Sequence, residues 1–284
     1  MSRYKRRKRV DNSKKVKTQR QQLVDKIIEM MRTGDFTWRK AFSGNSLPYS
    51  KSTGKRYRGF NAFYLAFMAL EKGYKSSLWG TFHAWQEAGG NLAGQRAERI
   101  YLAKPRLDED ENIIGMNFRC FNVFNRDQVD GLEEEEDKNK LTLSGSLFGY
   151  FEKEGISIKN ALKASYAPGS DTVTLPERWQ KEDLGWSTIA HEAIHSTGHQ
   201  DRLARTGVTN LASFGSHAYS QEELIAELGA VFICSALSLS SEKAEQNSAA
   251  YLSSWIKVLK ENPAWLSSAA TEASKATDYI LDRI

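Results

Sequence analysis

Cysteines and long apolar runs are scarce in this chain of 284 residues, and each absence excludes a class of protein. The only two cysteines, Cys120 and Cys234, lie far apart and lack the close spacing of a metal-binding pair, so we expect reduced thiols in a cytoplasmic protein. No stretch approaches the roughly 18 consecutive apolar residues of a membrane span, so no membrane partner is expected. The basic N-terminus also lacks the apolar run of a secretory signal.

Acidic residues are nearly missing from the start of the chain. Residues 1–20 hold ten Lys/Arg and one acidic residue, and residues 21–132 are also net basic. By contrast, residues 133–284 hold 22 acidic residues against 14 Lys/Arg. A polyanion should therefore be attracted to the part of the molecule formed by residues 1–132 and not to the part formed by residues 133–284. We expect residues 1–20 to form a basic, disordered tail that can add to phosphate binding.

One acidic segment marks a domain boundary. The stretch DGLEEEEDKNK, Asp130 to Lys140, has a single apolar residue and cannot be buried at acceptable cost. We therefore predict a first domain over residues 21–132, an exposed linker over 133–140 and a second domain over 141–284.

The first domain is expected to mix helices and strands. Apolar residues recur with a period near 3.6 in three stretches, two of which end at glycines, and two later stretches alternate around the turn DEDEN. The predicted helices are 21–34, 59–74 and 81–90, and the predicted strands are 97–107 and 113–125. The domain is therefore assigned to the α+β class.

The second domain is expected to be mainly helical with a short β-sheet. A strand ending at Pro176 is predicted between helices over 143–156 and 184–198, and a further helix follows over 220–237. The rest of the chain is also predicted to be helical, with a break at Pro263.

Three of the five histidines fall within HEAIHSTGHQD, the eleven residues that end at Asp201. In a helix, residues i and i+4 share one face about 6 Å apart along the axis, so His191 and His195 can hold one ion. A catalytic zinc accepts imidazole nitrogens and has three protein ligands. Glu192 falls beside the two histidines, where a general base stands. The HExxH pattern favours a zinc peptidase site over a helix with surface histidines.

The third metal ligand can come from two places. A turn at Gly198 could bring His199 or Asp201 toward the ion, because HExxHxxGxxD is a known ligand spacing. The later helix SQEELIAELGA is largely apolar, so its acids would need a partner if buried. Its candidates are Glu222, Glu223 and Glu227. The residues alone leave this choice open.

The chain resembles the ArdC-type antirestriction proteins. In the second domain the resemblance is carried by DTVTLP, HEAIHSTGHQDRL and SQEELIAELGAVFIC. In the first domain it is carried by MMRTGDFTWRKAF, TGKRYRGFNAFYL, LWGTFHAWQEAGG and FNVFNRDQVDGL. Several separated motifs in the right order are far more specific than HExxH alone. The stretch NLAGQRAER departs from the family pattern after the GG pair, so the resemblance does not carry a phosphate contact over to this turn.

The resemblance implies a fold, a metal and a partner. It implies an N-terminal domain that binds single-stranded DNA and a C-terminal zincin-like metallopeptidase domain with one Zn²⁺ or another divalent ion. It also favours Glu223 over Asp201 as the third ligand. Protection of incoming DNA from host restriction would be the function, with an unknown protein substrate that could be a host restriction component. An edge strand TVTL, residues 172–175, is expected to bind that substrate.

A basic and aromatic surface in the first domain suits single-stranded DNA. Residues 39–58 hold six Lys/Arg and no acidic residue, with aromatic residues interleaved. Bases stack on aromatic rings while cations follow the phosphates. Three aromatic residues are expected in the core: Phe60, Phe63 and Phe67. Trp79 and His83 are expected to have structural roles rather than DNA contacts. The predicted DNA contacts are Trp38, Arg39, Lys40, Lys55, Arg56, Tyr57, Arg58, Asn61 and Tyr64.

Two rival functions remain at this stage. The zincin-like domain could be structural or inactive beside a DNA-binding module. The chain could also be a replication accessory protein, because similar N-terminal domains occur next to primase functions.

Overall fold

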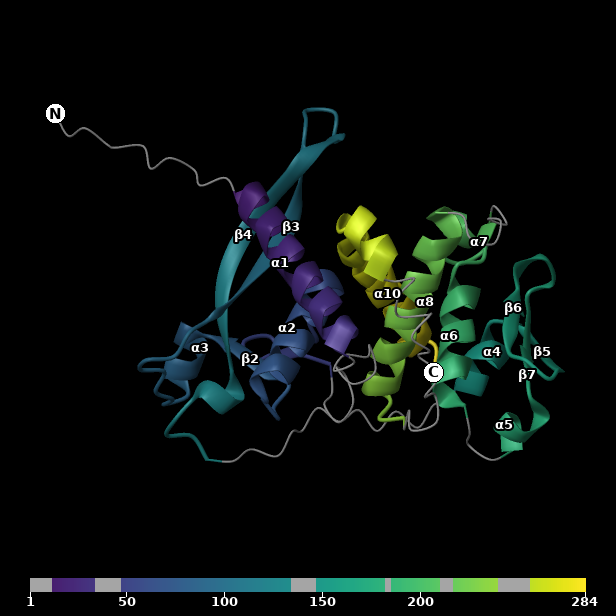
Figure 1. Cartoon of the computed structure of the whole chain (residues 1–284), viewed down its shortest axis with the longest axis horizontal. Helices are drawn as coiled ribbons and strands as arrows, with labels where there is room; N and C mark the ends of the chain where they lie inside the picture. The colour runs from purple at the N-terminus through teal and green to yellow at the C-terminus, as the bar shows by residue number, and fades with distance from the viewer. Residues whose placement is uncertain (1–11, 34–46, 134–146, 182–184, 210–216, 240–255) are drawn as a thin grey trace.

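The computed structural model describes residues 12–33, 47–133, 147–181, 185–209, 217–239 and 256–284. Figure 1 shows a unit built on a four-stranded sheet beside a mainly helical unit with a small three-stranded sheet. This arrangement confirms the predicted α+β class. Within the described residues, no helix is long and apolar enough to cross a membrane.

The first unit is organised around a long β-hairpin. Strand β3 (Glu98–Leu107) pairs with β4 (Ile113–Asn125) in antiparallel register, which confirms the two predicted strands. The sheet order is β1-β2-β4-β3, with β1 (Tyr49–Ser50) parallel to β2 (Leu78–Thr81). Strand β3 therefore lies at the edge, and the hairpin extends beyond the body of its unit (Figure 1). The sequence analysis did not predict β1 or β2, which are too short for a visible alternation.

Two helices of this unit form as their sequences predict. Helix α2 (Gly59–Lys72) ends at Gly73, whose left-handed φ of 69° suits glycine. Helix α3 (Phe82–Glu87) begins after Thr81, whose side chain accepts a hydrogen bond from the Ala84 amide. A 3-10 turn, η1 (Arg126–Gln128), follows β4.

Helix α1 (Asn12–Thr33) begins nine residues earlier than predicted. The expected disordered tail over residues 1–20 is therefore wrong for residues 12–20, which are helical, while residues 1–11 lie outside the described part of the chain. The basic run contains no glycine or proline that would end a helix, and Gln19 Nε2 donates to the Arg99 carbonyl at 2.6 Å.

The aromatic core of the first unit is largely as predicted. Phe63, Phe67 and Trp79 are fully buried, which confirms their core assignment. Phe60 is only half-buried and packs at the margin of the core. His83 is exposed and pairs with Glu87 one helical turn later.

The second unit places a small sheet on one side of its helices. Strands β5 (Ser157–Asn160), β7 (Thr172–Leu175) and β6 (Ser165–Ala167) form the sheet in that order. The expected edge strand 172–175 is therefore the central strand, so the prediction that it binds a substrate strand is wrong. The edges belong to β5 and β6, strands of four and three residues that the sequence did not predict.

Helices build the rest of this unit. The predicted helices are confirmed as α4 (Leu147–Lys153), α6 (Trp186–Thr197) and α8 (His217–Ala236). Helix α10 (Ala264–Leu281) starts directly after Pro263. Three further short helices are η2 (Pro168–Ser170), α5 (Glu177–Lys181) and α7 (Thr206–Thr209), and residues 256–261 are also helical.

Helix α10 joins the two units. It packs against α8 and α6 on one side and against α2 of the first unit on the other. The Gly59 amide at the start of α2 donates to Ser274 Oγ of α10 at 2.7 Å. Apolar residues of both units, from Phe63 to Ile280, therefore belong to one continuous buried core. The predicted linker 133–140 lies almost wholly outside the described residues.

Candidate metal centre and DNA-contact residues

Helix α6 presents two histidines on one face, as the i, i+4 spacing predicts. His191 Nε2 and His195 Nε2 lie 3.1 Å apart, and both side chains are mostly buried. The rings point toward α8, which packs closely against α6 because Gly229 has no side chain there. A Cβ on Gly229 would lie 2.6 Å from Ile194 Cδ1.

Glu223 of α8 completes a set of three ligand atoms. Its two oxygens lie 3.5 Å from His191 Nε2 and 3.6 Å from His195 Nε2. Ligands about 2.05 Å from a tetrahedral ion are separated by about 3.3 Å, and each histidine Nε2 atom lies near that distance from the other and from one of the two Glu223 oxygens. In the described residues these side chains form the one group of three or more His, Cys, Asp or Glu suited to a metal. The residues therefore fit a divalent ion.

Glu222 supports the site from behind. Its Oε1 lies 3.2 Å from His195 Nδ1, so the proton of that ring sits on Nδ1 when Nε2 binds a metal. Arg205 donates two hydrogen bonds to Glu222, from Nε to Oε2 at 3.0 Å and from Nη2 to Oε1 at 2.7 Å. Burial alone would raise the pKa of Glu222, but hydrogen bonds from His195 and Arg205 outweigh it and hold the pKa below its usual range.

Glu227 has the equivalent position behind the other histidine. Its Oε1 lies 3.8 Å from His191 Nδ1, on the far side of the ring from Glu223. Burial lowers the pKa of His191, but the hydrogen bond to Glu223 and the charges of Glu227 and Glu192 raise it to about 9. A metal ion at this site would compete with the proton that these carboxylates favour on His191. The structure groups Glu223, and neither Glu222 nor Glu227, with the Nε2 atoms.

Asp201 and His199 lie outside the group. Asp201 is largely exposed and faces His199 Nδ1 at 3.5 Å. Gly198 is right-handed at φ −79°, so it does not fold the chain back toward the ion. Its lack of a side chain serves packing instead, because a Cβ would lie 2.5 Å from Val208 Cγ2.

Glu192 lies next to the candidate ligands on α6. Its side chain is buried, with 7% of its surface exposed. Its carboxylate is close enough to raise the pKa of His191. A buried carboxylate beside the metal ligands is suited to accept a proton.

A buried ionic cluster holds the end of α6. Arg202 donates to both oxygens of Asp171 at 2.9 and 2.6 Å, to Glu154 at 3.1 Å and to the Ser196 carbonyl at 2.9 Å. Glu154 also accepts from Tyr279 and Arg283 of the C-terminal segment. The cluster ties the metal helix to the small sheet and to α10.

The predicted DNA-contact residues fall into three groups. Trp38, Arg39 and Lys40 lie outside the described residues. Lys55 and Arg58 are exposed and lie around the start of α2. Arg56 is half-buried, and its Nη1 atom is buried without a hydrogen bond to the described residues.

The remaining three have structural contacts of their own. Tyr57 is half-buried against the core, and burial raises its pKa. Tyr64 stacks on Phe60 and donates to Glu98 Oε2 at 2.5 Å. The Asn61 side chain donates from Nδ2 to the Tyr101 carbonyl and accepts at Oδ1 from the Tyr101 main-chain amide. Their contact with DNA stays a prediction.

Comparison with known families matches both units. A family model described as the N-terminal domain of anti-restriction factor ArdC matches residues 17–145, and one described as a zincin-like metallopeptidase matches residues 149–272. Curated relatives include the DNA primase TraC of Escherichia coli, 30% identical over 306 residues. That match covers 96% of this chain but only 20% of TraC, and a second TraC match covers 27% of its length. The chain thus spans less than a third of these relatives.

Two further comparisons extend over nearly whole chains. The uncharacterized protein y4eC of Sinorhizobium fredii is 30% identical over 86% of this chain and 83% of its own length. The crystal structure of antirestriction ArdC protein from plasmid R388, metal-free, matches with a TM-score of 0.73 at 33% identity, covering 93% of this chain and 97% of that chain. Its Mn(II)-bound structure matches with the same TM-score at 32% identity. This chain belongs to the ArdC family of antirestriction proteins, with an ArdC N-terminal domain followed by a zincin-like metallopeptidase domain.

Proposed function

We propose that this protein binds single-stranded DNA through its first unit and hydrolyses peptide bonds at a zinc site in its second, and so protects incoming DNA from host restriction. The observation that carries the peptidase is the group of His191, His195 and Glu223 with Glu192 beside it. The domain division at 21–132 and 141–284 is part of this proposal.

The mechanism assigns one role to each side chain. His191, His195 and Glu223 would hold a Zn²⁺ ion, which would supply Lewis acidity toward a peptide carbonyl and a water molecule. Glu192 would act as the general base that takes a proton from water and as the acid that gives it to the leaving amine. Glu222 and Glu227 keep the imidazole rings oriented, because a carboxylate behind a ligating histidine fixes its tautomer.

The substrate is expected along β6. This strand is an edge of the small sheet, lies antiparallel to β7 and contacts α6, which carries the metal ligands. An extended peptide can add to an exposed sheet edge through main-chain hydrogen bonds. We propose that the substrate is a protein, and a component of the host restriction system is one candidate.

Single-stranded DNA is expected around the start of α2. Lys55, Arg56 and Arg58 lie there with Tyr57 among them. Unpaired bases can stack on aromatic rings that a duplex cannot reach, which favours single strands over double strands.

The test compares wild type with Glu192→Gln in the presence of single-stranded DNA, with self-cleavage fragments measured by mass spectrometry. Both proteins should carry about one divalent ion per chain, and only wild type should cleave. His191→Ala serves as the metal-free control. Cleavage by Glu192→Gln at the wild-type rate would exclude Glu192 as the base.

The similarity to TraC supports a second candidate function. Here the protein would bind single-stranded DNA as a replication accessory, and its zincin-like domain would be structural. Absence of cleavage in both wild type and Glu192→Gln, with loss of stability on metal removal, would favour this alternative.

A further inference from the structure

One arginine connects the two helices that carry the metal ligands. Arg205 lies in the turn between α6 and α7, and only 6% of its side chain is exposed. Toward α8 it donates two hydrogen bonds to the Glu222 carboxylate. Toward α6 it donates from Nη2 to the Ile194 carbonyl and from Nη1 to Thr197 Oγ1, each at 2.7 Å. A single guanidinium group therefore links α6 to α8.

The partners of Arg205 are direct neighbours of metal ligands. Ile194 precedes His195 on α6, and Glu222 precedes Glu223 on α8. Glu222 Oε1 also lies 3.2 Å from His195 Nδ1. This oxygen is thus shared between Arg205 and a ligand ring, and a carboxylate in that place orients the ring.

The C-terminal end of α6 leaves a carbonyl for this arginine. The last carbonyls of a helix have no amide partner within the helix and need another donor. The Gly198 amide bonds to the His195 carbonyl at 2.8 Å. The Ile194 carbonyl accepts instead from two side chains, Arg205 at 2.7 Å and Thr197 at 2.6 Å. Arg205 therefore caps α6 one residue before a metal ligand.

The backbone directly before Arg205 is strained. Ala204 has a φ of 47°, in the left-handed region that residues other than glycine rarely adopt. Hydrogen bonds hold the turn, because the Ala204 amide donates to the His199 carbonyl at 3.0 Å and the Arg205 amide to the Gly198 carbonyl at 3.1 Å. Strained residues persist where the surrounding structure holds them, and they cluster at functional sites.

Stability is a weak reason to keep this ion pair. The side chains of Arg205 and Glu222 are 6% and 5% exposed. Removing two charges from water offsets most of their attraction, so an apolar pair of similar volume is often as stable. A guanidinium group instead fixes geometry, because its donors form a rigid planar fork that lysine lacks.

We propose that Arg205 is a positioning residue of the metal centre. It fixes α6 against α8 where the ligands face each other, and it holds Glu222 against His195. Arg205 is not one of the ligands and acts through Glu222. This inference rests on the metal site of the proposed function, and it adds a residue that lies outside both the HExxH motif and the ligand set.

The test measures the affinity of the full chain for Zn²⁺ by competition with a chromogenic chelator. Arg205→Met removes all side-chain donors and should weaken zinc binding by about 10- to 100-fold, the usual effect of losing support behind a ligating histidine. Arg205→Lys keeps the charge without the fork and should show an intermediate loss. The Co²⁺ d–d absorption spectrum, which reports ligand geometry, should change in Arg205→Met.

A double variant, Arg205→Met with Glu222→Met, separates stability from positioning. Breaking a buried ion pair from one side strongly destabilises a fold, whereas replacing both partners by apolar side chains is often neutral or stabilising. The double variant should therefore melt near the wild-type temperature and still bind zinc about 10- to 100-fold more weakly. It also keeps the proposal testable if Arg205→Met alone does not fold.

Arg202→Met is the matched control. Arg202 is also buried and also donates to a carbonyl of α6, that of Ser196, but its acidic partners are Asp171 and Glu154. This variant should lose stability while the folded chain keeps the zinc affinity and the Co²⁺ spectrum of wild type.

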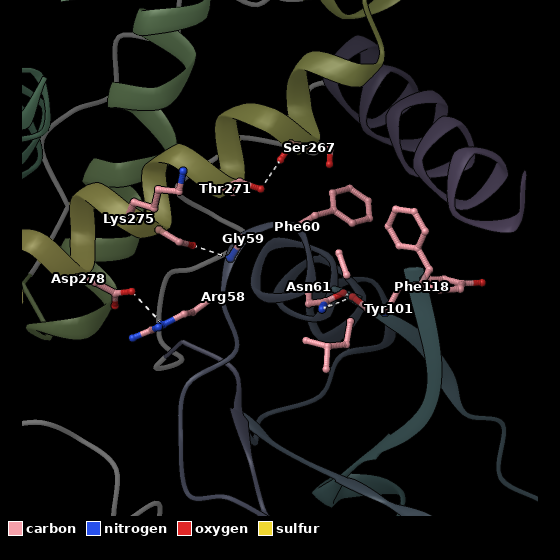
Figure 2. Close-up of a pocket in the computed structure, with 13 residues that line it drawn as sticks. Arg58, Gly59, Phe60, Asn61, Tyr101, Phe118, Ser267, Thr271, Lys275 and Asp278 are labelled. Carbon is pink, nitrogen blue, oxygen red and sulfur yellow. Dashed lines mark hydrogen bonds and ion pairs between the residues drawn. The ribbon is translucent and has the colours of Figure 1, made fainter. Parts of the chain in front are cut away.

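A second control lies at the contact between the two units. Figure 2 shows Asp278 of α10 beside Arg58, whose Nε atom lies 2.9 Å from the Asp278 carboxylate. Neither residue is among the hydrogen-bond partners of Arg205. Asp278→Asn removes this ion pair and should bind zinc as wild type does.

The outcomes separate this inference from the proposed function. If wild type binds zinc and both Arg205→Met and Arg205→Lys bind it equally well, the positioning role is wrong while the metal site stands. Recovery of zinc affinity together with stability in the double variant, or an equal loss in Arg202→Met, would make the role of Arg205 purely structural and would also overturn the inference. If wild type binds zinc without cleaving peptides, the peptidase is wrong and the positioning role stands. If wild type binds no divalent ion, both are wrong.

Discussion

Adjacent glutamates do different work at the metal centre. Glu223 offers its oxygens to the histidine Nε2 atoms, whereas Glu222 sits behind His195 and is held by Arg205. The two side chains leave α8 about 100° apart, so only one of them can face the ion. Two neighbouring glutamates that look equivalent in the sequence therefore have different roles: Glu223 is placed as a metal ligand, and Glu222 orients the His195 ring.

We predict graded losses of metal affinity at these positions. Glu223→Ala should lose most of the bound metal, because a ligand is gone. Glu222→Gln should weaken metal binding by about 10- to 100-fold, since removal of a partner behind a ligating histidine has effects of that size. Competition with a chromogenic chelator would measure both.

Asp201→Ala is the matched control, because Asp201 is exposed and outside the ligand group. It should bind metal as wild type does. Loss of metal from Asp201→Ala, with Glu223→Ala unaffected, would show that the ligand arrives through the glycine turn.

The helix pair α6 and α8 sets the spacing of the site. A glycine inside a helix usually lowers stability by roughly 0.5–1 kcal/mol relative to alanine. At Gly229 the opposite holds, because a Cβ would lie within 3.0 Å of three Ile194 side-chain atoms. The glycine therefore permits the close contact that brings Glu223 to the histidines.

We predict that Gly229→Ala destabilises the fold by about 1–3 kcal/mol, the usual range for overpacking a core. It should also weaken metal binding, because α8 must move away from α6. The double variant Gly229→Ala with Ile194→Ala should regain much of the metal affinity. Urea unfolding and chelator competition would measure the two effects. Stability equal to wild type in Gly229→Ala would show that the helices are not in contact there.

The cluster around Arg202 anchors the C-terminal end of α6. Arg202 is almost fully buried, so its charge needs Asp171 and Glu154. Burial alone would raise the pKa of each carboxyl, but hydrogen bonds from Arg202 to Asp171, and from Tyr279, Arg283 and Arg202 to Glu154, lower both pKa values.

These shifts predict a pH dependence with a definite sign. Carboxyls whose pKa is lower in the folded state stabilise it above their unfolded pKa values, 3.8 for Asp171 and 4.5 for Glu154. That stability is lost as pH falls from these values through the folded ones. Asp171→Asn should therefore be less stable than wild type at pH 7, and the gap should narrow below about pH 4.

Urea unfolding at pH 7 and pH 3.5 would measure this gap. Glu152→Gln, an exposed acid on α4, is the control and should show little difference from wild type at either pH. A gap between Asp171→Asn and wild type that is the same at both pH values would mean that the carboxylate charge is not what stabilises this cluster.

At the scale of the whole molecule, the metal-binding residues and the basic residues proposed to bind DNA lie in different units. The metal ligands lie on α6 and α8, and the basic residues proposed to meet DNA lie around α2. The two regions are joined by α10, which packs against α2, α6 and α8. A change of charge at the metal centre should therefore have little effect on the electrostatics of DNA binding.

We predict that Glu192→Gln leaves the affinity for single-stranded DNA unchanged. The slope of log affinity against log salt should also equal that of wild type, because it counts the phosphates neutralised by Lys and Arg. Oligonucleotide titrations at several salt concentrations would measure both. A shallower slope in Glu192→Gln would mean that the metal centre contributes to the DNA surface.

The sequence by itself determined the local features. The HExxH helix, the β3–β4 hairpin and helices α2 and α8 follow from apolar periodicity and turn residues close together in the chain. The motifs in the sequence also indicated the family to which the chain belongs. These predictions succeeded because each depends on neighbours within one element.

Only the tertiary structure decided the rest. The residues alone left the third ligand open and the family resemblance favoured Glu223 over Asp201, but the distances that support Glu223 depend on how α8 packs against α6 at Gly229. The central place of β7, the start of α1 at Asn12 and the contact of α10 with α2 were absent from the sequence reading. All of these depend on residues distant in the chain. Packing between distant segments has no periodic signal in one sequence, so its outcome is visible only once the chain is folded.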